Sequence, residues 1–217
     1  MALGRGLRIA LAALAVVAVA GCGGGKKHAT KADAAGCVPV SQPKPAQRTE
    51  PKPTKRLDPS KSYDVVLATN CGSFTIHLAV KTSPATTASF VSLVRKGYYD
   101  GTIFHRIVPG FVIQGGDPSA SGTGGPGYST VDRPPASTRY VLGLAAMAKA
   151  GNEAPGTSGS QFFVVTAKDA NLPPDYAVLG TVTKGLGVVR RSGKLGDPAT
   201  EQPTEIVEIE KATVHVG

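Results

Sequence analysis

The pattern of hydrophobic and polar positions divides the chain into three parts. An apolar run at 9–20 follows a short basic N-terminus, and 23–60 is rich in Gly, Lys, Ala and Pro but nearly free of large apolar residues. From residue 63 onward, short runs of alternating apolar and polar residues are separated by turn signals, a pattern typical of β-strands. We therefore predict a leader at 1–22, a disordered Pro/Lys-rich tether at 23–60 and one folded domain at 61–217.

Strands dominate the predicted domain, and helical spacing occurs twice. Ser83 and Pro84 are typical of an N-cap followed by proline at the first helical position, and Gly97 is typical of a helix end. A second, short helix is predicted at 187–194. Strands are predicted at 63–68, 74–80, 140–148, 160–167, 177–184 and 205–216, together with two central strands within 104–117.

Length and charge narrow the possible classes of protein. The chain has 217 residues and a net charge of +9, and without leader and tether it keeps about 155 residues, the size of one domain with a proper core. The charge is +2 for 1–22, +5 for 23–60 and only +2 for 61–217. A domain that binds nucleic acid would concentrate basic charge on a folded face, so we expect no nucleic-acid partner.

The leader has the features of a targeting segment. Arg5 and Arg8 precede an apolar run that is too short for a comfortable membrane span. It ends at Cys22 after Val-Ala-Gly, which resembles the lipobox of bacterial lipoproteins. The resemblance implies acylation of Cys22, including palmitate, and a stable lipid anchor in the cell membrane that faces outside the cytoplasm. The alternative is an ordinary secretory signal peptide in which Cys22 has no role.

Two further cysteines, Cys37 and Cys71, lie at the end of the tether and in the first predicted turn. Outside the cytoplasm two cysteines can form a disulfide. Such a bridge would join the tether to the first hairpin and contribute roughly 3–4 kcal/mol to stability. The sequence also allows both thiols to remain free.

One stretch, FHRIVPGFVIQGGD at 104–117, carries the clearest candidate chemistry. Two apolar runs flank a Pro-Gly turn signal, which predicts two strands joined by a bend. Since residues two apart on a strand share a face, Phe104 lies with Arg106, and Val112 with Gln114. A half-apolar face with one cation and one amide suits recognition rather than covalent chemistry. The alternative is a core hairpin in which Arg106 forms an ion pair at the rim.

A second motif, GSQFFVVTA at 159–167, identifies the family that the domain resembles. Together the two motifs resemble the cyclophilin family of peptidyl-prolyl cis-trans isomerases, over about 64–216. The resemblance implies a mainly β fold, a closed eight-stranded antiparallel barrel capped by two α-helices. It also implies X-Pro isomerisation in Pro-containing polypeptides, here exported proteins that it helps to fold, by a monomer that needs no cofactor. No metal is expected, because the four histidines lack ligand spacing.

The resemblance also assigns the site. Arg106 would be the catalytic cation, and Gln114 would bond the substrate backbone beside it. Met147 would form the floor of the groove, the backbone of Lys149 would pair with the substrate, and Gln161 would orient the cation. The remaining substrate-binding positions, namely the proline pocket with its edge and a shallow subsite, would be Phe111, Val112, Phe163, Leu172, Tyr176, Ala148 and Ala150.

Some features depart from the family or point elsewhere. Asn171 stands where many members carry Trp. The loop 122–127 formally matches the dinucleotide motif G-x-G-x-x-G, but Pro126 and the absence of a following helical pattern argue against it. Two rival functions stay open: a module that binds Pro-containing segments without turnover, and an adhesin that uses the basic tether.

Overall fold

A computed structural model describes residues 32–33 and 36–217 of the chain. The predicted leader, the predicted lipidation site Cys22 and the first part of the predicted tether lie outside the described residues. Within the described part, no helix has the length and apolar character needed to span a membrane.

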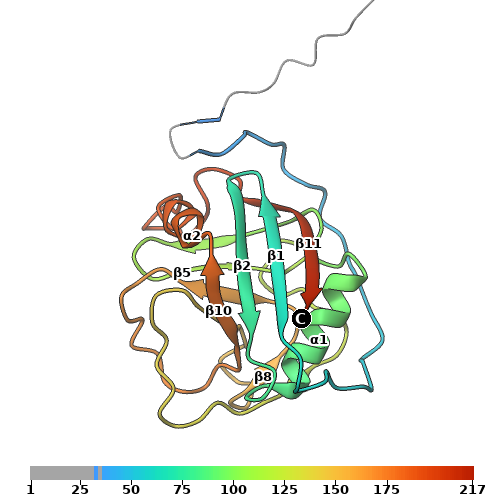
Figure 1. The fold of residues 1–217 in the computed structure, drawn as a ribbon. Coiled ribbons are helices and arrows are strands. Elements are labelled where there is room, and N and C mark those ends of the chain that lie inside the picture. The colour runs from blue at the N-terminus through green and yellow to red at the C-terminus, as the bar shows by residue number, and fades with distance from the viewer. Residues whose placement is uncertain (1–31, 34–35) are drawn as a thin grey trace, which may run out of the picture.

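The structure is built on one curled antiparallel sheet of nine strands, in the order β3-β11-β1-β2-β10-β7-β9-β5-β4. Figure 1 shows four of these strands, β10, β2, β1 and β11, side by side. Two short strands, β6 (Thr130–Val131) and β8 (Thr157–Ser158), form a separate pair. The helices are α1 (Pro84–Arg95) and α2 (Leu186–Ser192). The nine strands are β1 (Tyr63–Thr69), β2 (Gly72–Leu78), β3 (Thr102–Ile103), β4 (Arg106–Val108), β5 (Val112–Gly115), β7 (Leu144–Met147), β9 (Phe162–Val165), β10 (Val178–Lys184) and β11 (Glu208–Val216).

The closed eight-stranded barrel predicted from the resemblance is wrong, because the sheet forms a half-barrel that ends at β3 and β4. These edge strands have two and three residues, and the isolated pair Ile103–Asp117 joins β3 to the residues after β5 rather than to β4. So short a contact gives too few hydrogen bonds to complete a barrel. The outer edge of β4 is instead covered by a loop, since Ile107 N donates to Glu201 O at 2.9 Å.

The sheet buries apolar side chains on both faces, which follows from the two-residue period of a strand. In β9, Phe162 and Val164 belong to the main core, whereas Phe163 and Val165 belong to a smaller cluster. The main core is packed by rings such as Phe90, which lies 5.5 Å from Phe162 in an edge-to-face arrangement. The smaller cluster lies on the other face, where the site is found.

Helix α1 begins at the predicted proline, Pro84, and Gly97 follows its C-cap with φ of 68°. Ser83 occupies the N-cap position, but its side chain makes no capping hydrogen bond. The Ser83 hydroxyl is buried without a partner among the described residues, and the Ser83 carbonyl instead accepts a 2.8 Å bond from Thr87 Oγ1. The helix therefore starts with proline geometry rather than with a side-chain cap.

The described part of the predicted tether, 36–60, lies against the domain, which differs from the disordered spacer expected there. It has no helix or strand, yet Cys37 is bonded to Cys71 and Val38 N donates to Asn70 O at 2.8 Å. Figure 1 shows the segment running down the side of the molecule that carries α1. A disulfide and hydrogen bonds replace the apolar burial that the sequence lacks.

Candidate functional site

The predicted proline pocket corresponds to a cavity of about 230 Å³ on the face of the smaller cluster. Val112 and Phe163 are nearly fully buried in its wall, whereas Phe111, Leu172 and Tyr176 are half-buried. A cavity with an apolar, partly aromatic wall beside polar groups suits a small ring that carries a peptide bond. The lining consists only of predicted site residues: Arg106, Phe111, Val112, Gln114, Ala148, Lys149, Phe163, Leu172 and Tyr176.

Strand register brings the polar and apolar halves of this cavity together. Arg106 on β4 lies opposite Gln114 on β5, and Gln114 lies opposite Phe163 on β9. Ala146 on β7 completes the row by pairing with Phe163. Directly opposed residues on neighbouring strands project from the same face and contact one another. The small Ala146 side chain leaves space beside Phe163 on that face.

Aromatic rings that pack edge to face form one end of the cavity. The rings of Phe163 and Tyr176 meet edge to face at 5.4 Å, and Tyr140 packs on Tyr176 at 5.8 Å. Tyr140 Oη donates to Tyr176 O at 2.6 Å and accepts from Tyr176 N at 2.9 Å. Burial raises the pKa of Tyr140 to about 12. Tyr140 was not among the predicted site residues, although its aromatic side chain at a strand start was a signal.

A chain of hydrogen bonds holds Arg106 in place. Arg106 Nε donates to Glu201 Oε2 at 2.6 Å, and Arg106 Nη1 donates to Gln114 Oε1 at 3.3 Å. Gln114 Nε2 in turn donates to Gln161 Oε1 at 3.0 Å. Gln161 is therefore connected to the cation through Gln114, and its orienting role stays a prediction. The rim ion pair considered as an alternative for Arg106 is also present, at the same site.

Glu201 is the main site residue that the sequence did not indicate. It lies 95 residues beyond Arg106, in a stretch whose polar residues are typical of an exposed loop. Its backbone has φ of 60°, a left-handed conformation that is uncommon for a side-chain-bearing residue. Hydrogen bonds from Glu201 N to Asp197 O and from Ile107 N to Glu201 O hold it there, at 2.8 and 2.9 Å. The loop thus presents a carboxylate beside the predicted catalytic cation.

We expect Glu201→Gly to separate the positioning of Arg106 from folding stability. Loss of the carboxylate frees Arg106 Nε, so kcat for an X-Pro peptide should fall roughly three- to tenfold, an effect of about 1 kcal/mol as for an exposed ion pair. The free energy of unfolding should stay constant or rise, because glycine suits φ of 60°. Glu201→Gln, which keeps a hydrogen-bond acceptor, should retain more kcat. Unchanged kcat in Glu201→Gly, with exposed Glu210→Gln as the control, would show that Glu201 does not position Arg106.

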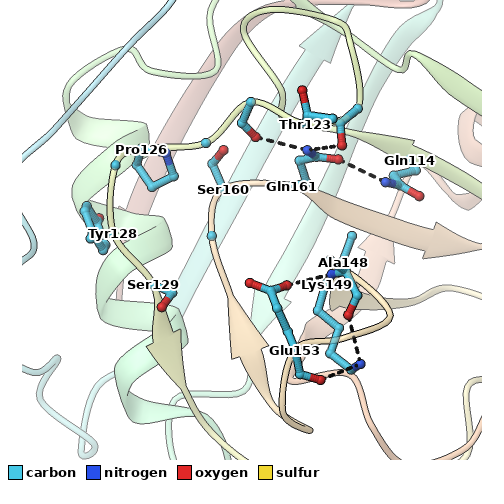
Figure 2. Close-up of a pocket in the computed structure, with 16 residues that line it drawn as sticks. Gln114, Thr123, Pro126, Tyr128, Ser129, Ala148, Lys149, Glu153, Ser160 and Gln161 are labelled. Atoms are coloured by element: carbon cyan, nitrogen blue, oxygen red, sulfur yellow. Dashed lines mark hydrogen bonds between the residues drawn. The ribbon is translucent and has the colours of Figure 1, made fainter.

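A second cavity of about 390 Å³ adjoins the first and shares Gln114, Ala148 and Lys149 with it (Figure 2). The predicted residues Ala150 and Gln161 line this second cavity. Because they share these three residues, the two cavities form one continuous groove.

Two loops face each other across the second cavity. On one side, the Gly-rich loop at 122–127 contributes backbone, and Gln161 Nε2 donates to Gly122 O at 2.9 Å and Gly124 O at 3.0 Å. On the other side, Lys149 Nζ donates to Glu153 O at 3.0 Å, and Ala150 N donates to Glu153 Oε2 at 2.6 Å. These bonds define both rims of the groove (Figure 2).

The predicted role of Met147 as the floor of the groove is wrong. Met147 is 1% exposed, belongs to the main core and lines neither cavity. In β7, Ala146 faces the smaller cluster, so Met147 points to the opposite face and Ala148 returns to the groove. Strand alternation therefore separates Met147 from the residues on either side of it.

The fully buried Asp117 holds the Gly-rich loop through hydrogen bonds to its backbone. Its carboxylate accepts hydrogen bonds from Ser119 N at 2.7 Å, Gly122 N at 2.7 Å and Gly124 N at 3.0 Å. Burial acts to raise the pKa of Asp117, but the bonds from Ser119, Gly124 and Gly122 together hold it below its ordinary value of 3.8. The carboxylate therefore stabilises the folded state in its charged form.

We expect Asp117→Asn to lower the free energy of unfolding at pH 7. We also expect the free energy of unfolding of this variant to fall less between pH 7 and pH 3 than that of the wild type. A carboxyl whose folded pKa is depressed contributes stability above its unfolded pKa, and this contribution is lost as the pH falls through the folded value. In the wild-type protein the loss should therefore begin near pH 4 and continue below it. Urea unfolding at pH 7, 4 and 3 would measure it, with exposed Glu210→Gln as the control. If the free energy of unfolding of Asp117→Asn fell with pH as steeply as that of the wild type, the stabilising role of the Asp117 carboxylate would be contradicted.

One group of possible metal ligands occurs among the described residues, formed by Asp33, Cys37 and Glu205. The sulfur of Cys37 is bonded to Cys71 and so is not a thiolate. This group is therefore a poor metal site.

Comparisons with known proteins agree on one family. The model of the family "Cyclophilin type peptidyl-prolyl cis-trans isomerase/CLD" matches residues 64–214. "Peptidyl-prolyl cis-trans isomerase-like 1" of Gibberella zeae is 40% identical over 155 residues, which cover 70% of this chain and 94% of that protein. The human protein of the same name is 39% identical over 153 residues, covering 69% and 90%.

Solved structures show the same likeness. A cyclophilin-type peptidyl-prolyl cis-trans isomerase of Cryptosporidium parvum superposes with a TM-score of 0.65 at 30% identity, covering 71% of this chain and 98% of that one. A second structure of that isomerase, determined in the presence of the dipeptide Ala-Pro, has a TM-score of 0.64. With the groove, its arginine and its apolar cavity, these matches show that the chain belongs to the cyclophilin-type peptidyl-prolyl cis-trans isomerase family.

Proposed function

We propose that this isomerase accelerates the cis-trans exchange of X-Pro bonds in exported proteins and so assists their folding. The observation that carries the isomerase part is that Arg106 and Gln114 line the same cavity as Phe111, Val112 and Phe163, across one row of strands. The extracytoplasmic part is supported by the lipobox-like ending at Cys22 and by the disulfide between Cys37 and Cys71, a bond typical of oxidising compartments.

The reaction requires rotation about a peptide bond and no covalent intermediate. The barrier is roughly 18–20 kcal/mol because the amide has partial double-bond character. During rotation the prolyl nitrogen loses conjugation and becomes a better hydrogen-bond acceptor. A donor aimed at this nitrogen stabilises the transition state more than the ground state and thereby lowers the barrier.

In the proposed mechanism, the cavity around Phe163 holds the proline ring and Arg106 donates to the prolyl nitrogen. Its bonds to Glu201 and Gln114 use two of the five guanidinium N–H groups, which leaves donors for the substrate. The charge and planar geometry of a guanidinium suit this task. Gln114, beside the cation, is proposed to bond the substrate backbone.

The isomerase proposal is tested by exchange spectroscopy on an Ala-Pro peptide with the full chain. Ala-Pro is a suitable probe because it was present with the Cryptosporidium parvum relative. Acceleration of exchange at catalytic concentrations of protein would support an enzyme. Saturable binding without acceleration would support the rival binding module instead.

The anchor proposal is tested separately by expressing the full chain and Cys22→Ser in a bacterium that processes lipoproteins. Incorporation of labelled palmitate and recovery in the membrane fraction should both depend on Cys22, because acyl chains supply roughly 0.8 kcal/mol per buried CH₂. A Cys22→Ser protein that stays in the membrane fraction would contradict the lipid anchor.

A further inference from the structure

Residues 46–50, here called the strap, lie in extended form along the domain. Ala46, Arg48 and Glu50 are half-buried, whereas Gln47 and Thr49 between them are exposed. This alternation is typical of an extended segment with one side on a surface. The strap carries no large apolar residue, so polar contacts must hold it in place.

Two side chains fix the strap to the turn after α1. The Arg48 guanidinium donates to the carbonyls of Tyr98 and Asp100, the latter at 3.0 Å, and approaches the carbonyl of Gly97 at 3.5 Å. Glu50 Oε2 accepts a 2.5 Å bond from Lys96 Nζ. An arginine that bonds several carbonyls at once gives a defined position rather than a loose association.

The strap also bonds the chain on both sides of Gly122, Gly124 and Gly125, the glycines of the loop that forms one wall of the larger cavity. Ala46 N donates to Pro118 O at 2.9 Å, and Glu50 N donates to Pro126 O at 2.9 Å. Beyond Pro126, Gly127 lies next to Thr49: a Cβ placed on this glycine would meet Thr49 Cγ2 at 3.4 Å. The contacts therefore bracket the segment whose glycines line the groove.

This loop needs such support because its own composition favours mobility. Gly122, Gly124 and Gly125 lose more conformational entropy on ordering than other residues would. Asp117 and Gln161 bind the loop at Gly122 and Gly124, but Gly125 has open space around the position of a Cβ. The strap supplies the contacts on both sides of these glycines.

We propose that Arg48 is a positioning residue for the isomerase: it seats the strap, which fixes the Gly-rich loop and thereby shapes the larger cavity for substrate residues that flank the X-Pro bond. This inference rests on the proposed isomerase function. The smaller cavity and Arg106 are held by β4, β5, β9 and Glu201, without direct contact to the strap. The strap therefore acts on the binding of longer polypeptides more than on rotation in the proline pocket.

The test compares Arg48→Ala with the wild type in the full chain on two substrates. One is a blocked Ala-Pro dipeptide, which reaches only the smaller cavity, and the other is a peptide extended by three residues on each side. Exchange spectroscopy gives kcat and KM for both. We expect KM for the extended peptide to rise roughly five- to tenfold, as for the loss of a charge-assisted contact. For both substrates kcat should change less than twofold. For the dipeptide, kcat/KM should also change less than twofold.

Two variants serve as references. Lys52→Ala removes an exposed cation from the same segment and should leave both substrates unaffected. Arg48→Lys, which keeps a donor for the carbonyls, should restore part of the KM of the extended peptide. Equal losses on both substrates, or an unchanged KM for the extended peptide, would overturn the proposal. Failure of the wild type to accelerate dipeptide exchange would instead contradict the isomerase function itself.

Discussion

Replacement of Arg106 with alanine should lower kcat/KM for an X-Pro peptide by roughly 10²–10³-fold, the loss typical of one transition-state donor. The guanidinium lies across one row of strands from the proline cavity, and its bonds to Glu201 and Gln114 hold it in one orientation. Because its contribution grows as the prolyl nitrogen becomes an acceptor, turnover should fall far more than peptide binding. The fold should persist, since Arg106 is half-exposed at an edge strand.

Exchange spectroscopy would measure turnover, and an NMR titration with the same peptide would measure binding. Arg139→Ala is a matched control, because this arginine is 75% exposed, pairs with Asp169 and lines neither cavity. A loss of binding as large as the loss of turnover would favour a binding module over an enzyme. Retained turnover would move the catalytic role away from Arg106.

Replacement of both Cys37 and Cys71 with serine should lower the free energy of unfolding by roughly 3–4 kcal/mol, as expected for a bridge that closes a loop of this length. The two residues are 34 positions apart and each is 2% exposed. Without the bridge, the unfolded chain gains entropy, while the hydrogen bonds between Val38 and Asn70 remain possible in the folded state.

Urea unfolding of the full chain would measure this difference, with and without reductant. Reductant should destabilise the wild type by a similar amount and leave the double variant unchanged. The Ser60→Ala variant is a control, since this exposed hydroxyl bonds only the neighbouring Asp58 within the described chain. A wild type that is insensitive to reductant would show that the two thiols do not pair in solution.

The sequence by itself determined the features that depend on short-range pattern. Alternation and turn signals located β1, β2, β9 and β10 to within a few residues, because a strand with one buried face repeats every two positions. Pro84 and Gly97 marked the limits of α1. The two motifs identified the family, and they carried most of the residues that line the proline cavity.

Errors arose where the outcome depended on the geometry of the sheet. The predicted barrel assumed that the end strands pair, whereas β3 and β4 are too short and a loop from 196–203 covers the edge of β4. The resemblance assigns Met147 to the floor of the groove, although the two-residue period of the strand turns its side chain into the main core. The open sheet and the burial of Met147 both depend on strand register and side-chain direction. Neither can be derived from the residues adjacent in sequence.

Only the tertiary structure decided which polar segments complete the site. Glu201 reaches Arg106 from a loop without apolar pattern, and Arg48 holds a segment that its composition predicts to be disordered. Sequence patterns indicate which apolar side chains are buried, because burial of apolar surface is the main driving force of folding. Buried positions recur with the period of the helix or strand that carries them. Hydrogen bonds and ion pairs between distant residues leave no such period, so they emerge only when the fold brings their partners together.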